Sequence, residues 1–409
     1  MLSPAAALRR ILDRMAEVGP LPAERVSLRE ALGRALAEDV VAPRSLPPFD
    51  NSQMDGYALR AADAPRAGAR LKVALEVFAG DAPAVALPPG TCARVFTGAP
   101  LPAGADAVEM QEEVSRRGVV AVFRRRAEVG RFVRPAGADV LEGAVALTRG
   151  SLVDPGAVGL AAALGRSELP VHRRPRVAIL PTGNEIVPID RHPAPGQIVD
   201  SNSHALAAAA LEAGAVPLVL PMAGDDRHSL RAALEAASGA DVLVTTGGVS
   251  VGEKDLVRTA LQAAGARLAL WQVALRPGKP FAFGTWGGTA VFGLPGNPVS
   301  SWVTFELFVR PALRALAGLP GSGRLRLPGR LSRAQDKPRH LTLYLRVRAR
   351  PSRGGLWLDP LRSQQSGHLT SAVGVDALAI LPAGLTRVAR GTRVDALWLR
   401  PPAATSDSK

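Results

Sequence analysis

Asp241-Val-Leu-Val-Thr-Thr-Gly-Gly-Val-Ser-Val-Gly-Glu-Lys-Asp255 is the stretch of the chain that decides the fold. It opens with an apolar run, passes into glycines and hydroxyls, and is followed by a helical pattern. The same succession repeats on both sides of it, and strands of this continuous Val/Ile/Leu type indicate a parallel sheet covered on both faces. Residues 171–320 are therefore predicted to form a central doubly wound α/β domain. The expected strands are 176–180, 216–221, 241–245, 268–275 and 290–293, and the expected helices are 203–213, 227–237, 255–264 and 298–316.

The chain on either side of this domain has a different pattern. Residues 1–45, together with 146–170, predict a helical and mixed N-terminal lobe, and residues 46–145 predict an inserted β-rich lobe of short apolar runs. Residues 324–401 are again all β and predict a small C-terminal β-barrel. The polar residues 402–409 predict a disordered tail. The expected fold class is thus a multidomain α/β plus β chain.

Composition limits the class of protein. The chain has 409 residues, 47% of them hydrophobic, which allows several domains with cores of their own. No apolar run approaches the roughly 20 residues of a membrane span, and the N-terminus reads as a first helix rather than a signal peptide. The single cysteine, Cys92, excludes an internal disulfide and a cysteine-built zinc site, and it favours a reducing, cytoplasmic setting.

The net charge of +14 raises the question of a nucleic-acid partner. The basic residues are almost all arginines scattered along the chain, and aromatic residues, which stack on single strands, make up only 4%. An anionic small substrate explains the charge equally well. We therefore expect no nucleic acid and no membrane among the partners.

Polar and glycine-rich loops follow every expected strand of the α/β domain. Turns use the same residue types for backbone reasons, so one such loop alone carries no functional meaning. Five of them at the carboxyl ends of the strands of one sheet predict a ligand-binding crevice at that edge. The loops are 181–185, 223–226, 245–255, 276–280 and 293–300.

Two of these loops suit an anion. Thr245–Ser250 places glycine N–H groups before a helix, an arrangement that binds phosphate, although it is neither a Walker loop nor a dinucleotide fingerprint. Asn297 and Pro298 suit the cap and the first turn of the next helix, so Ser300 would lie near the positive end of that helix.

Fixed charges of both signs accompany the loops. Lys279, one of the few lysines, and Arg276 lie in one glycine–proline loop and predict an oxyanion site, with solvated loop cations as the alternative. Carboxylates beside phosphate-binding loops predict Mg²⁺, which bridges protein and phosphate oxygens. Helix caps are the alternative for the aspartates among them. These carboxylates are Glu185, Asp225, Asp226 and Asp255.

Three polar segments stand out in the N-terminal half, at residues 49–58, 97–100 and 134–139. The first packs two carboxylates, two amides and a hydroxyl beside Tyr57, one of only two tyrosines. Each segment taken alone is more typical of a structural loop than of a catalytic site.

Together, the motifs resemble the molybdopterin molybdenumtransferase family of the MoeA type, which is related to the C-terminal domain of gephyrin. The resemblance covers about residues 5–400, and its specificity comes from the combination rather than from any one piece. The motifs, in chain order, are Asp50-Asn-Ser-x-Met-Asp-Gly-Tyr-Ala58, Phe96-Thr-Gly-Ala-Pro100, Thr182-Gly-x-Glu185, Asp200-Ser-Asn202, Thr246-Gly-Gly-Val-Ser-Val-Gly-Glu-x-Asp255, Pro277-Gly-Lys-Pro-Phe281 and Leu294-Pro-Gly-Asn-Pro-Val-Ser300.

The resemblance implies an enzyme that converts molybdate and adenylylated molybdopterin into molybdenum cofactor and AMP, with Mg²⁺. It also implies a homodimer whose active site combines the α/β domain of one subunit with the N-terminal lobes of the other. Transient contacts with the adenylyltransferase and with recipient molybdoenzymes follow from the same resemblance.

Site residues are carried over by motif position. The implied catalytic residues are Asp55, Thr97, Asp139, Glu185, Asp225, Asp226, Asp255 and Lys279, of which Glu185, Asp225 and Asp255 would bind Mg²⁺. The implied substrate-binding residues are Thr182, Gly183, Ser201, Thr246, Gly247, Gly248, Ser250, Gly252, Arg276, Pro295, Gly296, Asn297, Pro298 and Ser300. Arg339, Ser366 and Ser371 of the last domain are further candidates.

The chain departs from the family pattern at two positions. Asn184 stands where the family often has aspartate, which removes one negative charge beside Glu185. Arg276 stands where the family usually has lysine, and a guanidinium still binds an oxyanion, with two hydrogen bonds.

Three other functions compete with the transferase hypothesis. One is a molybdopterin-binding or adenylylating protein without metal insertion, which would require only the α/β domain. Another is a scaffold without turnover, against which the retained carboxylates argue. The third is nucleic-acid binding, which salt-dependent binding of random DNA would revive.

Overall fold

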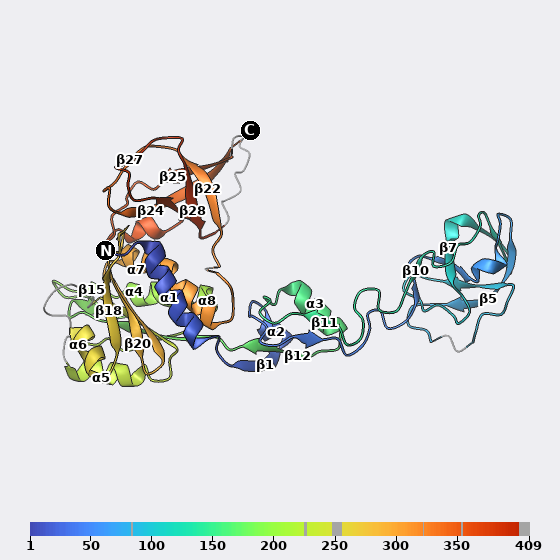
Figure 1. Cartoon of the computed structure of the whole chain (residues 1–409), viewed down its shortest axis with the longest axis horizontal. Helices are drawn as coiled ribbons and strands as arrows, with labels where there is room; N and C mark the ends of the chain where they lie inside the picture. The colour runs from blue at the N-terminus through green and yellow to red at the C-terminus, as the bar shows by residue number, and fades with distance from the viewer. Residues whose placement is uncertain (83–84, 225–226, 248–255, 322, 353–354, 401–409) are drawn as a thin grey trace. The chain divides into compact units, whose positions relative to one another are not determined.

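A computed structural model describes residues 1–82, 85–224, 227–247, 256–321, 323–352 and 355–400. The chain divides into two compact units, whose elements are labelled in Figure 1. The first unit comprises Met1–Glu24, Gly33–Ala37 and Pro170–Lys409, and the second comprises Arg25–Leu32 and Glu38–Leu169. None of the helices that the structure describes is long and apolar enough to cross a membrane.

The first unit contains the predicted α/β sheet. Its six strands lie in the order β16-β13-β17-β21-β20-β18, and the first four are parallel to one another. This confirms the predicted doubly wound domain. The strands are β13 (Arg176–Pro181), β16 (Val216–Val219), β17 (Val242–Thr246), β18 (Arg267–Gln272), β20 (Pro280–Trp286) and β21 (Thr289–Leu294).

Helices cover both faces of this sheet because its strands alternate their side chains. Val177 and Ile179 of β13 pack with α1, α4, α7 and α8, whereas Ala178 and Leu180 pack with α5 and α6 on the other face (Figure 1). The helices are α1 (Pro4–Val18), α4 (Asn202–Glu212), α5 (Arg227–Ala236), α6 (Leu256–Ala263), α7 (Pro298–Thr304) and α8 (Arg310–Leu316).

Strand β20 is absent from the expected set and runs antiparallel to both neighbours. Gly287 and Gly288 connect it to β21, with φ of 52° and 93°, and Trp286 pairs with Thr289. Two-residue hairpin loops favour positive φ at both positions, which glycine adopts without strain. A Gly-Gly pair between two apolar runs was therefore the signal for this hairpin.

Helix α1 packs in the first unit, although residues 1–45 were assigned to the N-terminal lobe. Its buried stripe of Ala7, Ile11 and Met15 joins the core beneath α8. The N–H of Leu2 donates to Gln272 O at 3.0 Å, which attaches the start of the chain beside β18. The stretch after α1 is β1 (Ala23–Ser27) and a short α2 (Leu28–Ala31), not a continuous helix.

The helix expected over 298–316 is interrupted by a π-helical turn at Phe305–Val309, between α7 and α8. Pro311 accounts for part of this geometry, because it has no N–H to bond the carbonyl of Leu307 and its ring crowds that carbonyl. The wider turn holds Glu306 in the interior, where it is 1% exposed.

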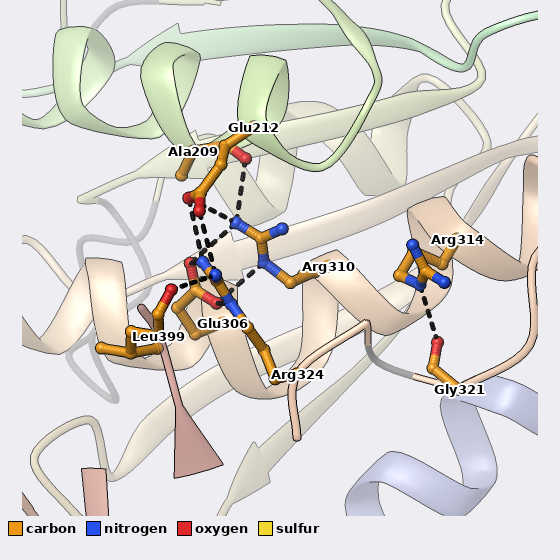
Figure 2. Close-up of polar contacts among 8 residues, drawn as sticks. All are labelled: Ala209, Glu212, Glu306, Arg310, Arg314, Gly321, Arg324 and Leu399. Atoms are coloured by element: carbon orange, nitrogen blue, oxygen red, sulfur yellow. Dashed lines mark hydrogen bonds and ion pairs between the residues drawn. The ribbon is translucent and has the colours of Figure 1, made fainter. Parts of the chain in front are cut away.

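Glu306 belongs to a group of four charged residues that we call the buried charge cluster: Glu306, Arg310 and Arg324, which are buried, and Glu212, which is 55% exposed at its rim (Figure 2). Arg310 Nε donates to Glu306 at 2.8 Å, and Arg324 Nε donates to it at 3.0 Å. Both arginines also donate to Glu212 of α4 at 2.9 Å. Arg324 further donates to Leu399 O at 2.6 Å, so the cluster joins the α/β domain to the end of the barrel.

The C-terminal part of the first unit forms the predicted barrel. Its strand order β24-β25-β22-β28-β26 closes through a further pairing of β26 with β24. Strand β19 (Leu275–Arg276), which comes from the α/β domain, pairs in parallel with the start of β24. The barrel strands are β22 (Arg326–Leu331), β24 (Thr342–Ser352), β25 (Gly355–Pro360), β26 (Ala377–Leu381) and β28 (Arg393–Trp398).

The second unit is built on a six-stranded sheet in the order β7-β4-β6-β5-β9-β8. Separate apolar cores cover its two faces, and Cys92 is buried in one of them, where burial raises the pKa of its thiol to about 12. The strands are β4 (Gly56–Leu59), β5 (Arg70–Val77), β6 (Thr91–Val95), β7 (Ala107–Met110), β8 (Val114–Arg117) and β9 (Val120–Phe123), and α3 (Pro155–Ala163) follows them in the chain.

The remaining strands form two-stranded pairs. They are β1 with β12 (Glu168–His172), β2 (Val40–Val41) with β11 (Val145–Leu147), β3 (Asn51–Ser52) with β10 (Val133–Arg134), β14 (Ile186–Val187) with β15 (Ile198–Val199), and β23 (Gln335–Asp336) with β27 (Arg387–Val388).

Candidate functional site

A cavity of about 320 Å³ lies where the loop after β19 meets the start of α7 and the barrel. We call it the Lys279 cavity. Many of the residues implied for the site line it, and the barrel contributes three more. The implied residues are Arg276, Lys279, Pro295, Asn297 and Ser300, and the barrel residues are Leu341, Gln364 and Ser366.

The loop that carries Lys279 is fixed from both sides. Val273 N–H donates to Lys279 O at 3.0 Å and closes the loop. Gly278 has φ of 105°, and a Cβ at this position would stand 2.5 Å from Thr304 Cγ2 of α7. Only glycine satisfies both constraints, so the loop rests directly on the helix.

The barrel side of the cavity depends on Arg346, which the sequence analysis did not select. Its backbone forms two hydrogen bonds with the Gln364 amide, and its buried guanidinium donates to the carbonyls of Ser363 and Gln365. Burial lowers the pKa of Arg346 to about 10. The sequence offered one signal for this role: Arg346 is a charged residue within an apolar strand, at a position where the alternation of side chains predicts an inward direction.

The other barrel candidates are placed differently. Ser366 O accepts the N–H of Val299 at 3.1 Å, which joins the barrel to α7 at the cavity. Ser371 is buried and donates to His368 O, and Arg339 is exposed. Neither Ser371 nor Arg339 is among the residues that line the Lys279 cavity.

Among the residues that the structure describes, the cavity lining carries charge of one sign, because it includes Arg276 and Lys279 but no carboxylate. Asn297 is the N-cap residue of α7 and makes no capping hydrogen bond with its side chain. Pro298 has no N–H and the N–H of Val299 is bonded to Ser366 O, so the Ser300 hydroxyl is the donor that the start of the helix adds to the cavity. This arrangement suits a compact oxyanion.

A second group of implied residues meets at the carboxyl edge of the sheet. The N–H and hydroxyl of Thr182 both donate to Thr246 O, at 3.2 and 3.1 Å. Gly247 has φ of 88°, and a Cβ on it would stand 2.8 Å from Thr182 O. A Cβ on Gly296 would stand 3.7 Å from the Cα of Gly247. The loops after β13, β17 and β21 therefore touch through glycines.

Two buried polar atoms in this crevice have no hydrogen-bond partner in the described part of the chain. They are Thr246 Oγ1 and Asn202 Oδ1. The other end of the Asn202 amide donates to Gly296 O at 2.7 Å, next to Ser201, the N-cap residue of α4. Buried polar atoms without partners are uncommon and indicate a ligand or an ordered water.

Glu185 is the implied metal ligand that the structure describes. Its carboxylate is exposed, and its oxygens lie 2.7 and 2.8 Å from the point where a Cβ on Gly183 would stand, so glycine makes room for them. The described residues contain no group of three acidic, histidine or cysteine side chains that could hold a metal. Asp225, Asp226, Gly248, Ser250, Gly252 and Asp255 lie outside the described residues.

In the second unit, Asp55 and Thr97 are in direct contact. The backbone N–H and the hydroxyl of Thr97 both donate to Asp55 Oδ1, each at 2.8 Å. The backbone hydrogen bond first, then the hydroxyl and the charge of Arg94, lower the pKa of Asp55. The carboxylate is therefore held ionised by donors already in place.

The three N-terminal motifs converge around β3. Ser52 N–H donates to Ala99 O at 2.9 Å, and Ala136 N–H donates to an oxygen of Asp50 at 2.7 Å. The strand pair β3–β10 lies between these contacts. The backbone N–H of Asp139 donates to Leu46 O at 2.9 Å, and the side chain of Asp139 is exposed.

Known proteins similar to this chain agree on one family. Residues 2–165 match the MoeA N-terminal region (domain I and II), residues 178–315 a probable molybdopterin binding domain, and residues 328–399 the MoeA C-terminal region (domain IV). The chain is 40% identical to molybdopterin molybdenumtransferase 2 of Mycobacterium tuberculosis over 384 residues, 91% of this chain and 94% of that one.

Two further matches cover most of the chain. The sequence is 36% identical to the molybdopterin molybdenumtransferase of Bacillus subtilis over 389 residues, 92% of this chain and 90% of that one. The structure is similar to a crystal structure of the molybdopterin biosynthesis MoeA protein from Pyrococcus horikoshii, with a TM-score of 0.82 and 33% sequence identity, covering 96% of this chain and 99% of that one.

Proposed function

The chain belongs to the molybdopterin molybdenumtransferase family, and on this premise we propose how its residues insert molybdenum into adenylylated molybdopterin. The enzyme is a transferase of molybdenum-cofactor biosynthesis. The proposed substrates are molybdate and adenylylated molybdopterin, and the proposed products are molybdenum cofactor and AMP.

The Lys279 cavity is the observation that carries the proposal for molybdate. Lys279 and Arg276 line it together with Ser300, and none of the lining residues in the described part of the chain is a carboxylate. A small dianion is attracted to such a cavity by charge and by hydrogen bonds from the cations and the hydroxyl. Arg276 provides a planar donor pair, so replacement of the usual lysine preserves the chemistry.

The loop Pro295–Asn297 connects this cavity to the crevice where the pterin would bind. Pro295 and Asn297 line the cavity, while the carbonyl of Gly296, between them, accepts the Asn202 amide in the crevice. Thr246 Oγ1 and Asn202 Oδ1, which have no partner among the described residues, would bind polar groups of the pterin or its phosphates. One loop would thus hold molybdate next to the dithiolene, and the two cations would stabilise charge that develops as AMP leaves.

The exposed Glu185 fits a magnesium site that the substrate completes. Mg²⁺ often keeps several waters and binds one or two carboxylates plus substrate phosphates, so a single protein carboxylate among the described residues is compatible with it. Mg²⁺ would neutralise charge on the phosphoanhydride. Asp225 and Asp255 remain the further proposed ligands.

We also propose a cytoplasmic homodimer with composite active sites. The polar group of the second unit, Asp55 with Thr97 and Asp139, offers carboxylates and a hydroxyl, whereas the crevice of the first unit offers glycine loops and cations. The two sets are chemically complementary, which supports a site that needs both. Transient contacts with the adenylyltransferase and with recipient molybdoenzymes complete the proposal.

The test is AMP release by purified protein with adenylylated molybdopterin and Mg²⁺ as molybdate is varied. For Lys279→Gln we expect a KM for molybdate raised by about tenfold or more, since a charge-assisted hydrogen bond is worth roughly 1.5–3 kcal/mol. The control Arg390→Gln removes an exposed barrel cation that does not line the cavity. An unchanged KM in Lys279→Gln contradicts the assignment of the cavity.

The alternative function, pterin binding or adenylylation without metal insertion, is separated by the same assay. Tight pterin binding without molybdate-dependent AMP release would favour it. That result would direct attention to Asn184, the position where the chain lacks the usual carboxylate.

A further inference from the structure

A short segment of the barrel, residues 363–368, supplies part of the wall of the Lys279 cavity. Gln364 and Ser366 line the cavity, and the carbonyl of Ser366 accepts the N–H of Val299 in the first turn of α7 at 3.1 Å. The position of this segment therefore determines both the barrel wall of the cavity and a contact at the start of the helix that lines it.

Arg346 of β24 holds the first half of the segment. Its buried guanidinium donates to the carbonyls of Ser363 and Gln365, each at 3.3 Å. Its backbone forms two hydrogen bonds with the side-chain amide of Gln364, at 3.1 and 2.9 Å. These bonds fix residues 363–365, and other contacts must hold residues 366–368.

His368 closes the segment on itself. Its Nδ1 lies 2.8 Å from Ser363 Oγ, which also accepts the N–H of Gln365 at 3.4 Å. The carbonyl of His368 accepts the N–H and the hydroxyl of Ser371, at 2.9 and 2.5 Å, and Ser371 belongs to the 3₁₀ helix η4 (Leu369–Ala372). His368 is thus attached to η4 through its backbone, and its ring contacts Ser363 at the other end of the segment.

The Ser363–His368 contact matters more for position than for stability. His368 is exposed and Ser363 is half-buried, and water competes for a hydrogen bond between such groups, so its effect on the free energy of unfolding is small. The contact joins the two ends of the segment, however, and the residues between them include Gln364 and Ser366. Without it, these two residues are less well placed, and small displacements of a binding wall weaken binding.

A histidine at this place makes the contact respond to pH. A neutral imidazole without a proton on Nδ1 accepts the Ser363 hydroxyl, whereas a protonated imidazole donates from Nδ1 to Ser363 Oγ in a charge-assisted hydrogen bond. The protonated ring also adds positive charge to the segment beside a cavity that suits an oxyanion. Both effects have the same sign, so oxyanion affinity should increase as pH falls through the range in which histidine gains its proton.

The neighbouring cations do not titrate in that range. Arginine and lysine side chains stay protonated near neutral pH, and burial lowers the pKa of Arg346 only to about 10. Among the described residues, the cations that line the cavity, bond the segment or adjoin it in sequence are Arg276, Lys279, Arg346 and Arg362. A second exposed histidine, His340, precedes the lining residue Leu341 and provides a control.

We propose that His368 is a positioning residue for the oxyanion bound in the Lys279 cavity. Through Ser363 it holds Gln364 and Ser366 in the wall, and its protonation tightens binding. The described lining of the cavity does not include His368, so it acts through the segment rather than by touching the ligand. The inference rests on the proposed function, because the oxyanion is the molybdate assigned to this cavity.

The test measures AMP release by purified full-length protein at saturating adenylylated molybdopterin and Mg²⁺, with molybdate varied at about pH 6 and about pH 8, on either side of the usual histidine pKa. For wild type we expect a KM for molybdate about threefold lower at the lower pH. For His368→Ala we expect a KM at the lower pH raised by about three- to tenfold, with kcat and the urea midpoint close to wild type.

His368→Asn is the conservative variant, because its amide can bond Ser363 but carries no titratable proton. We expect its KM to match that of wild type at the higher pH and to stay constant as pH falls. Ser363→Ala/His368→Ala should bind molybdate no more weakly than His368→Ala, since both changes remove one contact. The control His340→Asn should keep the pH dependence of wild type.

Three results overturn the proposal: a wild-type KM for molybdate in His368→Ala, a wild-type pH dependence in His368→Asn, or a loss of pH dependence in His340→Asn. A His368→Ala protein that loses stability or kcat while its KM is unchanged has only a structural role for this residue. Lys279→Gln separates this proposal from the cavity assignment. If its KM is unchanged, both fail; if its KM rises while that of His368→Ala does not, only the role of His368 fails.

Discussion

The buried charge cluster of the first unit and the outer surface of the sheet in the second unit use arginine in opposite ways. In the cluster, Arg310 and Arg324 are 5% and 9% exposed, and both hold Glu306 and Glu212 (Figure 2). On the sheet of the second unit, Arg70 of β5 and Arg117 of β8 are exposed, and neither forms an ion pair with a carboxylate among the described residues. The difference shows that the number of arginines does not predict their contribution to stability or binding until their burial and their ion pairs are known.

The largest expected effect comes from breaking the cluster at its most buried member. Glu306→Gln leaves Arg310 and Arg324 facing a neutral amide in the interior. Removing one partner of a buried ion pair costs about 3–5 kcal/mol, and we expect the lower end of that range because Glu212 still binds both arginines. The urea midpoint, followed by circular dichroism, should fall accordingly.

Arg326→Gln is the matched control for that variant. Its partner, Asp395, is 49% exposed, and exposed pairs contribute about 0–1 kcal/mol. A Glu306→Gln protein as stable as Arg326→Gln would show that the cluster is solvated rather than buried, and the contrast drawn above would be lost.

A smaller effect is expected from Arg324→Lys, which keeps the charge and changes the geometry. Arg324 donates to both carboxylates of the cluster and to Leu399 O, whereas lysine has one nitrogen. Loss of one or two hydrogen bonds to charged groups predicts about 1.5–3 kcal/mol of destabilisation. If the KM of Arg324→Lys for molybdate rises while its kcat is unchanged, the cluster also orients the barrel at the Lys279 cavity. If the free energy of unfolding of Arg324→Lys equals that of wild type, the result contradicts the geometry in Figure 2.

Fold class could be predicted from sequence because periodicity and loop chemistry agreed. Continuous apolar strands alternating with helices can bury both faces only in a doubly wound sheet, and the residues of β13 do so. The closed barrel followed from the all-β pattern after residue 324. The hairpin β20–β21 and the π-helical turn were not predicted, because a glycine pair signals the first and a proline the second, and neither changes the periodicity of apolar residues.

The candidate site was predictable only where chemistry lies in a short motif. Lys279, Ser300 and Asn297 belong to two glycine–proline loops that meet in one cavity. Gln364 and Arg346 had no motif, since their importance comes from the barrel strand that β19 joins. Pairing between segments that are far apart in the chain leaves no local motif, so this portion of the site could not be predicted from one sequence.

The smallest expected effect concerns Asp55, an exposed carboxylate stabilised by hydrogen bonds rather than by burial. Its folded pKa lies below the usual value of 3.8, so its stabilising contribution is complete above that value and is lost as pH falls through the folded pKa. Thr97→Val removes the hydroxyl donor but keeps the stronger backbone donor, and the pKa should rise only part of the way to 3.8. Carboxyl ¹³C NMR of aspartate-labelled protein, assigned with Asp55→Asn, measures both titrations. Equal pKa values in wild type and Thr97→Val would mean that the backbone N–H and Arg94 alone hold the charge, and a pKa that reaches 3.8 would mean that the hydroxyl positions the backbone donor as well.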